Sequence, residues 1–193
     1  MAGRKRLIVL SAPSGAGKTT VARHLLRVLT NARFSVSATT RPMRPREVDG
    51  KDYFFLSKDE FEKRIQEQDL IEYEQIFGNY YGTLRSEVQR ALDSDEIMIF
   101  DVDVKGAISL QKAFPDDTFL LFIAPPSKEE LEHRLRSRST ESEEQLRMRL
   151  ERVEMELEQQ ELFDAVIIND VLPETLAQSE RLVKRQLEDK KNA

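Results

Sequence analysis

The chain lacks cysteine altogether, although it is 193 residues long. A disulfide framework, a cysteine-ligated metal and a thiol nucleophile are therefore excluded. Apolar runs long enough to cross a bilayer are missing too, and the basic residues before Leu7–Leu10 do not make that segment a signal peptide. We therefore expect a cytoplasmic protein with no membrane partner.

An excess of basic residues is also missing. Lys and Arg total 30 against 35 Asp and Glu, which gives a net charge of −5. Domains that bind nucleic acid usually carry a clear basic excess, so we expect no nucleic-acid partner, and any basic patch must serve a local purpose. The length suits one folding unit with inserted lobes. The sequence leaves the oligomeric state open.

Short apolar segments alternate with helix-like stretches along the chain. This alternation predicts an α/β fold, with a parallel core sheet flanked by helices. The expected strands cover 7–10, 97–100, 119–123 and 165–168, with 34–36 as a weaker fifth candidate. The expected helices cover 19–30, 104–113, 127–138, 142–160 and 173–189.

Three helix starts carry a capping signature, in which a hydroxyl is followed three residues later by Glu or Gln. These starts are Ser57-x-x-Glu60, Ser127-x-x-Glu130 and Ser142-x-x-Gln145. Residues 37–96 break the alternation, because Pro42 and Pro45 interrupt an irregular loop that is followed by strand-like and helix-like pieces. We interpret this range as a small inserted lobe that is partly β.

The segment "SAPSGAGKTT" at positions 11–20 resembles a phosphate-binding loop between a strand and a helix. In such a loop, backbone N–H groups and the helix N-terminus bind phosphate, a lysine reaches the β- and γ-phosphates, and the next hydroxyl binds magnesium. The pattern G-x-x-x-x-G-K-[ST] is met except at its first glycine, where the chain has Ala12. Alanine is tolerated there if its φ stays negative, which we expect. The alternative is a strand, a glycine turn and an ordinary helix, which this context disfavours.

The loop defines the expected donor site for ATP. The residues expected to contact ATP are Ala12, Pro13, Ser14, Gly15, Ala16, Gly17, Lys18, Thr19 and Thr20. In "IMIFDVD", apolar residues end in Asp101 and then Asp103, where a carboxylate beside a phosphate loop anchors magnesium. We therefore expect Thr19 and Asp101 to hold Mg²⁺. The alternative for Asp101 is a cap on the turn that follows.

The acceptor of the phosphate has to be inferred from other residues. GTPases read guanine with an N-K-x-D motif, which this chain does not contain. A metabolic kinase is favoured, because Arg41 and Arg44 in the proline-stiffened loop can clamp one phosphate through bidentate hydrogen bonds. Taken alone, these two arginines have a plain alternative as solvated surface residues.

Several separate motifs resemble the guanylate kinase family, in order and in spacing. They are "SATTRPMRPREVDGKDYFF", "LIEYEQIFGNYYGT", "FDVDVKGA" and "RLRSRSTESEEQLRMRL", and the resemblance runs from Leu7 to about Leu187. It implies the fold of the P-loop nucleoside monophosphate kinases. It also implies a core at 5–36, 97–126 and 161–190, a GMP-binding lobe at 37–96 and a mobile helical lid at 127–160.

The resemblance also implies roles for individual residues. It implies that the GMP phosphate is held by Arg41, Arg44, Tyr53 and Tyr81, and that Glu72 and Thr83 read the guanine, with Ser37 and Asp103 nearby. It implies that Arg134, Arg138 and Arg149 close over the phosphates, with Lys18 and Arg44 also catalytic, and that Asn169 and Asp170 border the adenine. The lid departs from a common family form in having Ser139 where glycine is frequent.

The chemistry of Glu72 agrees with guanine recognition. Guanine presents two adjacent donors, N1–H and the N2 amine, to one carboxylate, and its O6 can accept a proton from Thr83. Adenine has a lone pair at N1 and would face Glu72 acceptor to acceptor. Because Glu72 alternates with apolar neighbours, it can lie on one strand face that points into a cleft. Without the resemblance, a solvent-facing glutamate is the plainer interpretation.

We therefore expect Mg²⁺-dependent transfer of the γ-phosphate of ATP to GMP, and to dGMP, because nothing identified in the sequence selects at the ribose 2′ position. One alternative is a guanylate-kinase-like module that binds a protein and has lost catalysis. Such a module should have lost parts of the phosphate loop or the lid charges, and this chain keeps Gly17, Lys18 and Thr19. Another is a kinase for a different acceptor, such as a phosphorylated sugar.

Overall fold

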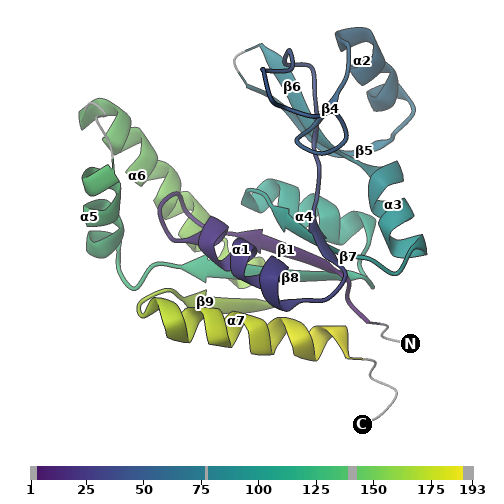
Figure 1. Ribbon diagram of the computed structural model, residues 1–193. Coiled ribbons are helices and arrows are strands. Elements are labelled where there is room, and N and C mark those ends of the chain that lie inside the picture. Colours follow the sequence, from purple (N-terminus) through teal and green to yellow (C-terminus); the bar gives the residue numbers. More distant parts are fainter. Residues whose placement is uncertain (1–3, 77, 139–142, 189–193) are drawn as a thin grey trace.

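A computed structural model describes residues 4–76, 78–138 and 143–188. The side chains of residues 137–149 and of residue 152 lie outside this description. Figure 1 shows a layered core from which two parts project, one made of β3–β6 and α2 and the other of α5 and α6. No helix within the described ranges is both long and apolar enough to span a bilayer.

The core is a five-stranded sheet in the order β2-β7-β1-β8-β9, and every neighbouring pair is parallel. The strands are β1 (Leu7–Ser11), β2 (Ala32–Phe34), β7 (Ile97–Asp101), β8 (Thr118–Ala124) and β9 (Ala165–Ile168). Four of these strands were expected from their apolar runs, and the α/β class is confirmed. The fifth expectation, 34–36, was wrong by two residues. β2 is an edge strand with half-buried side chains, so its sequence lacks the fully apolar signal of the inner strands.

Alternate residues of the strands pack into two separate hydrophobic clusters, one on each face of the sheet. Ile8 and Leu10 point to the face covered by α1 (Lys18–Val28) and α7 (Leu172–Leu187). Leu7 and Val9 point to the face covered by α4 (Val104–Ala113) and α3 (Arg85–Asp93). Side chains that alternate between two buried faces are typical of a strand covered on both sides. Each fully buried aliphatic side chain stabilises the fold by about 1.5–3 kcal/mol relative to an exposed one.

The helical elements between β8 and β9 are α5 (Lys128–Arg138), α6 (Glu143–Glu158) and the 3-10 turn η1 (Gln160–Leu162). The five helices expected in the core and lid are confirmed with small shifts at their ends. At the start of α5, the backbone N–H of Glu130 donates to Ser127 Oγ at 3.1 Å, as the capping signature predicts. The third signature begins at Ser142, which lies outside the described residues.

The projecting lobe contains a four-stranded mixed sheet in the order β4-β3-β6-β5. Its strands are β3 (Ala38–Thr39), β4 (Phe54–Phe55), β5 (Leu70–Ile76) and β6 (Asn79–Leu84), and α2 (Lys58–Gln66) lies over it. A small core of its own holds the lobe together around Phe61, with Ala38 and Leu84. α2 begins with the full capping box that the sequence predicts at Ser57 and Glu60.

Helix α3 was not expected. It follows β6 directly, and its N-cap residue, Leu84, makes no side-chain capping bond, so the start signal used elsewhere is missing. Although α3 falls within the range 37–96, its buried residues Val88, Ala91 and Leu92 pack in a cluster of the core sheet. The division of the chain into core, lobe and lid stays a prediction.

Candidate active site

The phosphate-binding loop joins the end of β1 to the start of α1, at the carboxyl edge of the parallel sheet. This edge is where open α/β sheets bind their ligands. Gly15 and Gly17 have φ of 89° and 101°, values that only glycine adopts freely. Positive φ outside glycine occurs, within the described residues, at Asn31, Arg46, Gln68 and Asp95. Ala12 is not among them, so the expectation for its φ is confirmed, and its methyl group is buried in the core.

The side chain of Lys18, in the first turn of α1, extends to the end of β7. Its Nζ lies 2.7 Å from Asp101 Oδ1 and donates to the Val102 carbonyl oxygen at 2.9 Å. Thr19 Oγ1 donates to the other oxygen of the same carboxylate, Asp101 Oδ2, at 3.3 Å. Asp101 therefore joins the lysine and the hydroxyl of the loop. The capping role falls to Asp103, whose Oδ1 accepts from the Gly106 N–H at 2.9 Å at the start of α4.

The oxygen atoms of Thr19 and Asp101 fit Mg²⁺ by their chemistry. Magnesium prefers hard oxygen ligands, and in kinases it is bound by one or two protein groups together with substrate phosphates. A dedicated cage is therefore not required. In agreement with this, the described residues contain no cluster of three or more acidic, histidine or cysteine side chains suited to a metal.

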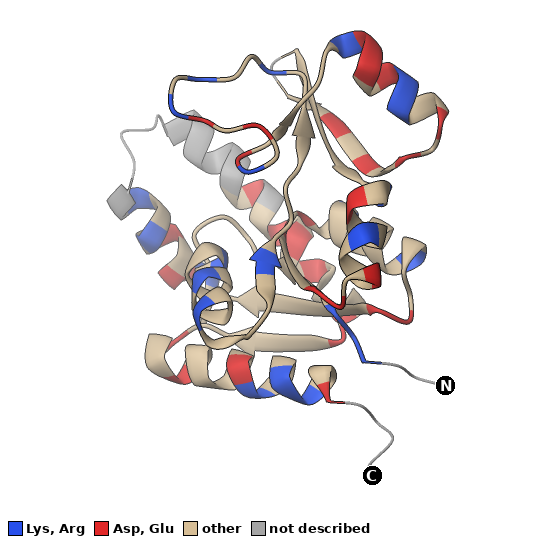
Figure 2. Ribbon diagram, turned by 45° about the vertical axis from the view of Figure 1, so that its right-hand side comes forward, with Lys and Arg blue, Asp and Glu red and all other residues tan. Residues whose placement is uncertain are grey.

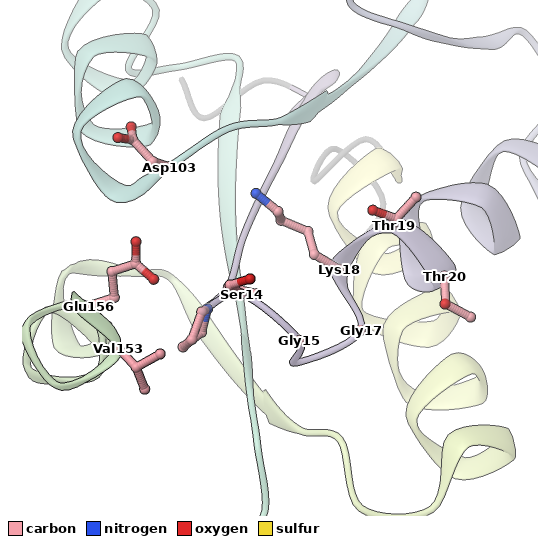
Figure 3. A pocket seen from close by; sticks show the side chains of 11 residues that line it. Ser14, Gly15, Gly17, Lys18, Thr19, Thr20, Asp103, Val153 and Glu156 are labelled. Carbon is pink, nitrogen blue, oxygen red and sulfur yellow. The ribbon is translucent and has the colours of Figure 1, made fainter. Parts of the chain in front are cut away.

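The phosphate-binding loop lines a pocket of about 510 Å³. Figure 3 shows Lys18 pointing from the loop into the space in front of Asp103 and Glu156. This size is typical of a site for a small molecule. The wall of the pocket consists of Ala12, Pro13, Ser14, Gly15, Gly17, Lys18, Thr19, Thr20, Asp103, Val153 and Glu156. Of the expected loop residues, Ala16 is missing from this wall, because its side chain is fully buried.

A second pocket, of about 520 Å³, lies between the lobe and the end of β7. The expected residues in its wall are Lys18, Ser37, Glu72, Tyr81, Asp101 and Asp103. Lys105 and Ser109 of α4 also line it, and neither was expected there. Lys18 and Asp103 belong to the walls of both pockets, so the two cavities adjoin at these side chains.

Glu72 and Thr83 face each other across the β5–β6 ladder. They are register partners, and Thr83 Oγ1 donates to Glu72 Oε1 at 2.7 Å. Burial raises the pKa of the Glu72 carboxyl, and the nearby charges of Asp103 and Glu74 raise it further, although the Thr83 hydroxyl acts in the opposite direction. The result is a partly desolvated carboxylate in the wall of the second pocket.

Arg41 and Arg44 lie in the loop between β3 and β4, where basic and acidic segments lie close together (Figure 2). The Arg41 guanidinium donates to both oxygens of Glu47, at 2.7 and 3.1 Å, and the backbone N–H of Arg44 donates to Glu47 Oε2 at 2.6 Å. These contacts hold the pKa of Glu47 below its usual value. Arg41 also lies over the ring of Tyr53, which contacts Tyr81 edge to face.

Glu47 was not anticipated. The signal available in the sequence was a carboxylate six residues after one arginine and three after the other, within a proline-stiffened loop. An acidic residue among arginines is usually read as surface charge, so its bidentate contact emerges only from the folded loop.

The arginines expected to close over the phosphates lie on α5 and α6. Arg134 Nε donates to Glu130 at 2.7 Å, and its Nη1 donates to the carbonyl oxygen of Asn169 at 3.2 Å. Arg138 and Arg149 belong to these helices, but their side chains lie outside the described part of the chain, as does Ser139 entirely.

The two residues expected to border the adenine differ in exposure. Asp170 is exposed, whereas Asn169 is only 6% exposed and its side chain donates to the Ala16 carbonyl oxygen. Neither residue is part of the wall of the first pocket. Their contact with adenine stays a prediction.

Comparisons with known proteins agree with this geometry. The family model described as guanylate kinase matches residues 4–186. The guanylate kinase of Chlorobium luteolum is 52% identical over 171 residues, which are 89% of this chain and 87% of that protein. The guanylate kinase of Thermotoga maritima is 39% identical over 181 residues, which are 94% of this chain and 87% of that protein. The crystal structure of guanylate kinase from Anaplasma phagocytophilum superposes with a TM-score of 0.71 at 30% identity, covering 97% of this chain and 89% of that one. The chain belongs to the guanylate kinase family.

Proposed function

We propose that this enzyme transfers the γ-phosphate of ATP to GMP, and to dGMP, giving ADP and the corresponding diphosphate. The observation that carries the proposal is the pair of adjoining pockets that share Lys18 and Asp103. One pocket is built on a phosphate-binding loop and the other on a half-buried carboxylate. A donor and an acceptor bound in these pockets would meet at Lys18.

On the donor side, the N–H groups of the loop and the N-terminus of α1 bind the phosphates of ATP. Lys18 exchanges Asp101 and the Val102 carbonyl for the β- and γ-phosphates. Bound Mg²⁺ would neutralise charge on the phosphates, and Thr19 and Asp101 are the residues that would hold it. Asn169 and Asp170 border the adenine.

On the acceptor side, Glu72 accepts the N1–H and N2 amine protons of guanine, and the Thr83 hydroxyl turns from Glu72 to O6. Ser37 and Asp103 lie beside the base. The phosphate of GMP is held by Arg41, Arg44, Tyr53 and Tyr81. Support comes from Glu72 in the pocket wall, from its hydrogen bond with Thr83 behind it, and from the chain of contacts that links Arg41 through Tyr53 to Tyr81.

In the reaction, a phosphate oxygen of GMP forms a bond to the γ-phosphorus while the bond between that phosphorus and ADP breaks. Negative charge spreads over the migrating group, so catalysis consists of positioning and of positive charge in a dry site. Lys18, Arg44, Arg134, Arg138 and Arg149 supply this charge. For Arg134, this requires leaving Glu130 and Asn169, and closure of α5 and α6 provides the movement.

The test is a coupled assay of ADP formation with purified protein, ATP and Mg²⁺. GMP and dGMP are compared with AMP, UMP and a sugar phosphate, and we expect AMP to be used about 10⁴-fold less efficiently than GMP. A Lys18→Met preparation, purified identically, controls for contaminating kinases. Binding of ATP without turnover of GMP would contradict the proposal and favour a catalytically inactive interaction module, whereas turnover of another acceptor would redefine the substrate.

A further inference from the structure

Asn169 lies behind the phosphate-binding loop, at the end of β9. Its side chain is 6% exposed, and Nδ2 donates to the carbonyl oxygen of Ala16 at 2.7 Å. The backbone N–H of Asn169 donates to the carbonyl oxygen of Ala124 at 2.7 Å, which ties the residue to the end of β8. The amide group is therefore held by the core sheet and reaches the loop from its buried side.

This hydrogen bond determines the direction of a peptide plane. In a trans peptide, the carbonyl of one residue and the N–H of the next point to opposite sides. Because the Ala16 carbonyl points to Asn169 in the buried interior, the N–H of Gly17 points away from it. Gly17 lines the pocket whereas Ala16 and Asn169 do not, so an N–H that points away from Asn169 faces the site of the phosphates.

The residue at position 17 has to be glycine for this contact with Asn169 to form. A methyl group built on Gly17 would overlap with Nδ2 of Asn169, and the φ of Gly17 is +101°. The glycine is thus needed both for the backbone angle and for the close approach of the asparagine amide. Asn169 also accepts a hydrogen bond from Arg134 Nη1 through its own carbonyl oxygen, at 3.2 Å.

We propose that Asn169 is a positioning residue, whose side chain fixes the Ala16–Gly17 peptide so that the Gly17 N–H faces the phosphates of the donor. The identity of that donor as ATP rests on the proposed function. This role of the side chain acts through the loop backbone and is separate from the border with adenine that is proposed for the same residue. It predicts that a ligand with phosphates but no base depends on Asn169 just as ATP does.

The experiment uses Asn169→Asp, which keeps the size of the side chain but replaces the donor with an acceptor facing the Ala16 carbonyl. Binding of ATP, of inorganic tripolyphosphate and of GMP is measured by calorimetry with Mg²⁺ present. We expect ATP and tripolyphosphate each to bind about tenfold more weakly or worse, and GMP to bind within about twofold of the unmodified protein. Asn169→Ala, which adds no charge, is measured alongside and replaces the aspartate variant if that variant does not fold.

The matched control is Asn31→Asp, because Asn31 Nδ2 also donates to a backbone carbonyl, that of Asp95 at 3.0 Å, far from the loop. Weaker ATP binding with unchanged tripolyphosphate binding would overturn the proposal, because Asn169 would then act through adenine alone. Unchanged binding of both ATP and tripolyphosphate would show that the Asn169 side chain has no role in donor binding. Equal losses for ATP and GMP together with a lower melting temperature would reduce Asn169 to a structural residue. Because no phosphoryl transfer is measured, failure of the proposed reaction would leave this test intact.

Discussion

Two loops of the molecule face the expected phosphates, and they are held in different ways. The donor loop, residues 12–17, is held by the core. A methyl group on Gly15 would crowd the side chains of Leu131 and Leu135, and Ala16 is bound from behind by the buried Asn169. Its shape is therefore determined by packing and by the sheet.

The acceptor loop, residues 41–52, is held by carboxylates on the surface. Glu47 binds Arg41 and the N–H of Arg44, and Asp52 accepts from the N–H of Val48 at 2.8 Å. Met43 and Val48 are more than half exposed, so little apolar packing supports the loop. The difference indicates that the donor loop is preformed, whereas the proposed acceptor loop is ordered by polar contacts that a bound phosphate or salt can exchange.

The largest effect is expected at the point where the two sites meet. Lys18→Met keeps the aliphatic chain but removes the charge, and we expect kcat to fall by about 10²- to 10³-fold, because positive charge at the migrating phosphate is lost. Steady-state kinetics with both substrates measures this. Lys58→Met, on the exposed face of α2, is the control. A kcat near that of the control would show that Lys18 does not act on the transferred group.

A smaller effect, confined to the acceptor, is expected for Glu72→Gln. The amide presents N–H groups to guanine donors, so KM for GMP should rise about 10- to 100-fold while KM for ATP stays within about twofold. Glu67→Gln, in an exposed i, i+4 pair, is the control. An unchanged KM for GMP would remove Glu72 from the base-reading role and weaken the contrast between the two sites.

The same substitution should stabilise the free protein. Since burial raises the pKa of Glu72 in the folded state, its contribution to stability is present below the pKa of the unfolded chain and is lost as pH rises through the folded pKa. At pH 7, where this carboxyl is ionised in the unfolded chain, folding is therefore penalised at Glu72 in a way that glutamine avoids. The melting temperature of Glu72→Gln should be higher than that of the unmodified protein at pH 7. This difference should shrink as the pH falls toward 4.5, the ordinary pKa of a glutamate. A constant difference across this range would contradict the assignment.

A weaker effect is expected for Glu47→Gln. Glutamine replaces one of the two carboxylate oxygens with an N–H donor and removes the charge, so it cannot reproduce the two-oxygen pairing with Arg41, and KM for GMP should rise about two- to fivefold. The difference from the unmodified enzyme should narrow as salt is added, because the ion pair is near the surface. Glu62→Gln, which breaks the exposed pair with Lys58, serves as the control. A change in KM for ATP of the same size would show that the two loops are not independent.

The smallest effect is expected for Ala12→Gly, which restores the missing glycine of the loop pattern. Because Ala12 already has an ordinary φ and a buried methyl group, kinetic constants should stay within about twofold and the free energy of unfolding should fall by about 1 kcal/mol. Kinetics and urea unfolding measure the two quantities. A large gain in activity would mean that Ala12 constrains the donor loop.

The sequence predicted best what depends on local pattern. Apolar runs indicate the inner strands, and the capping signatures at Ser57 and Ser127 indicate where two helices begin. The edge strand β2 was misplaced because half-buried residues carry a weaker signal, and α3 was missed because its start at Leu84 has no capping side chain.

Site residues that belong to a sequence motif could be predicted. Contacts that form only when distant residues meet in the fold could not. Lys18, Glu72 and Tyr81 were expected, and they line the pockets. The bond between Asn169 and Ala16 joins residues 153 positions apart, and no local pattern predicts it. Glu47 is close in sequence to Arg41, but its role depends on the turn that the loop takes.

The raised pKa of Glu72 has a consequence for the choice of base. Acid protonates this carboxyl before a carboxyl with an ordinary pKa, and the protonated group becomes a donor. A donor no longer matches the N1–H of guanine, but it does match the lone pair at N1 of adenine. If Glu72 reads the base as proposed, mild acid should therefore reduce the preference of the enzyme for GMP over AMP, because a proton on this side chain changes which purine edge it matches.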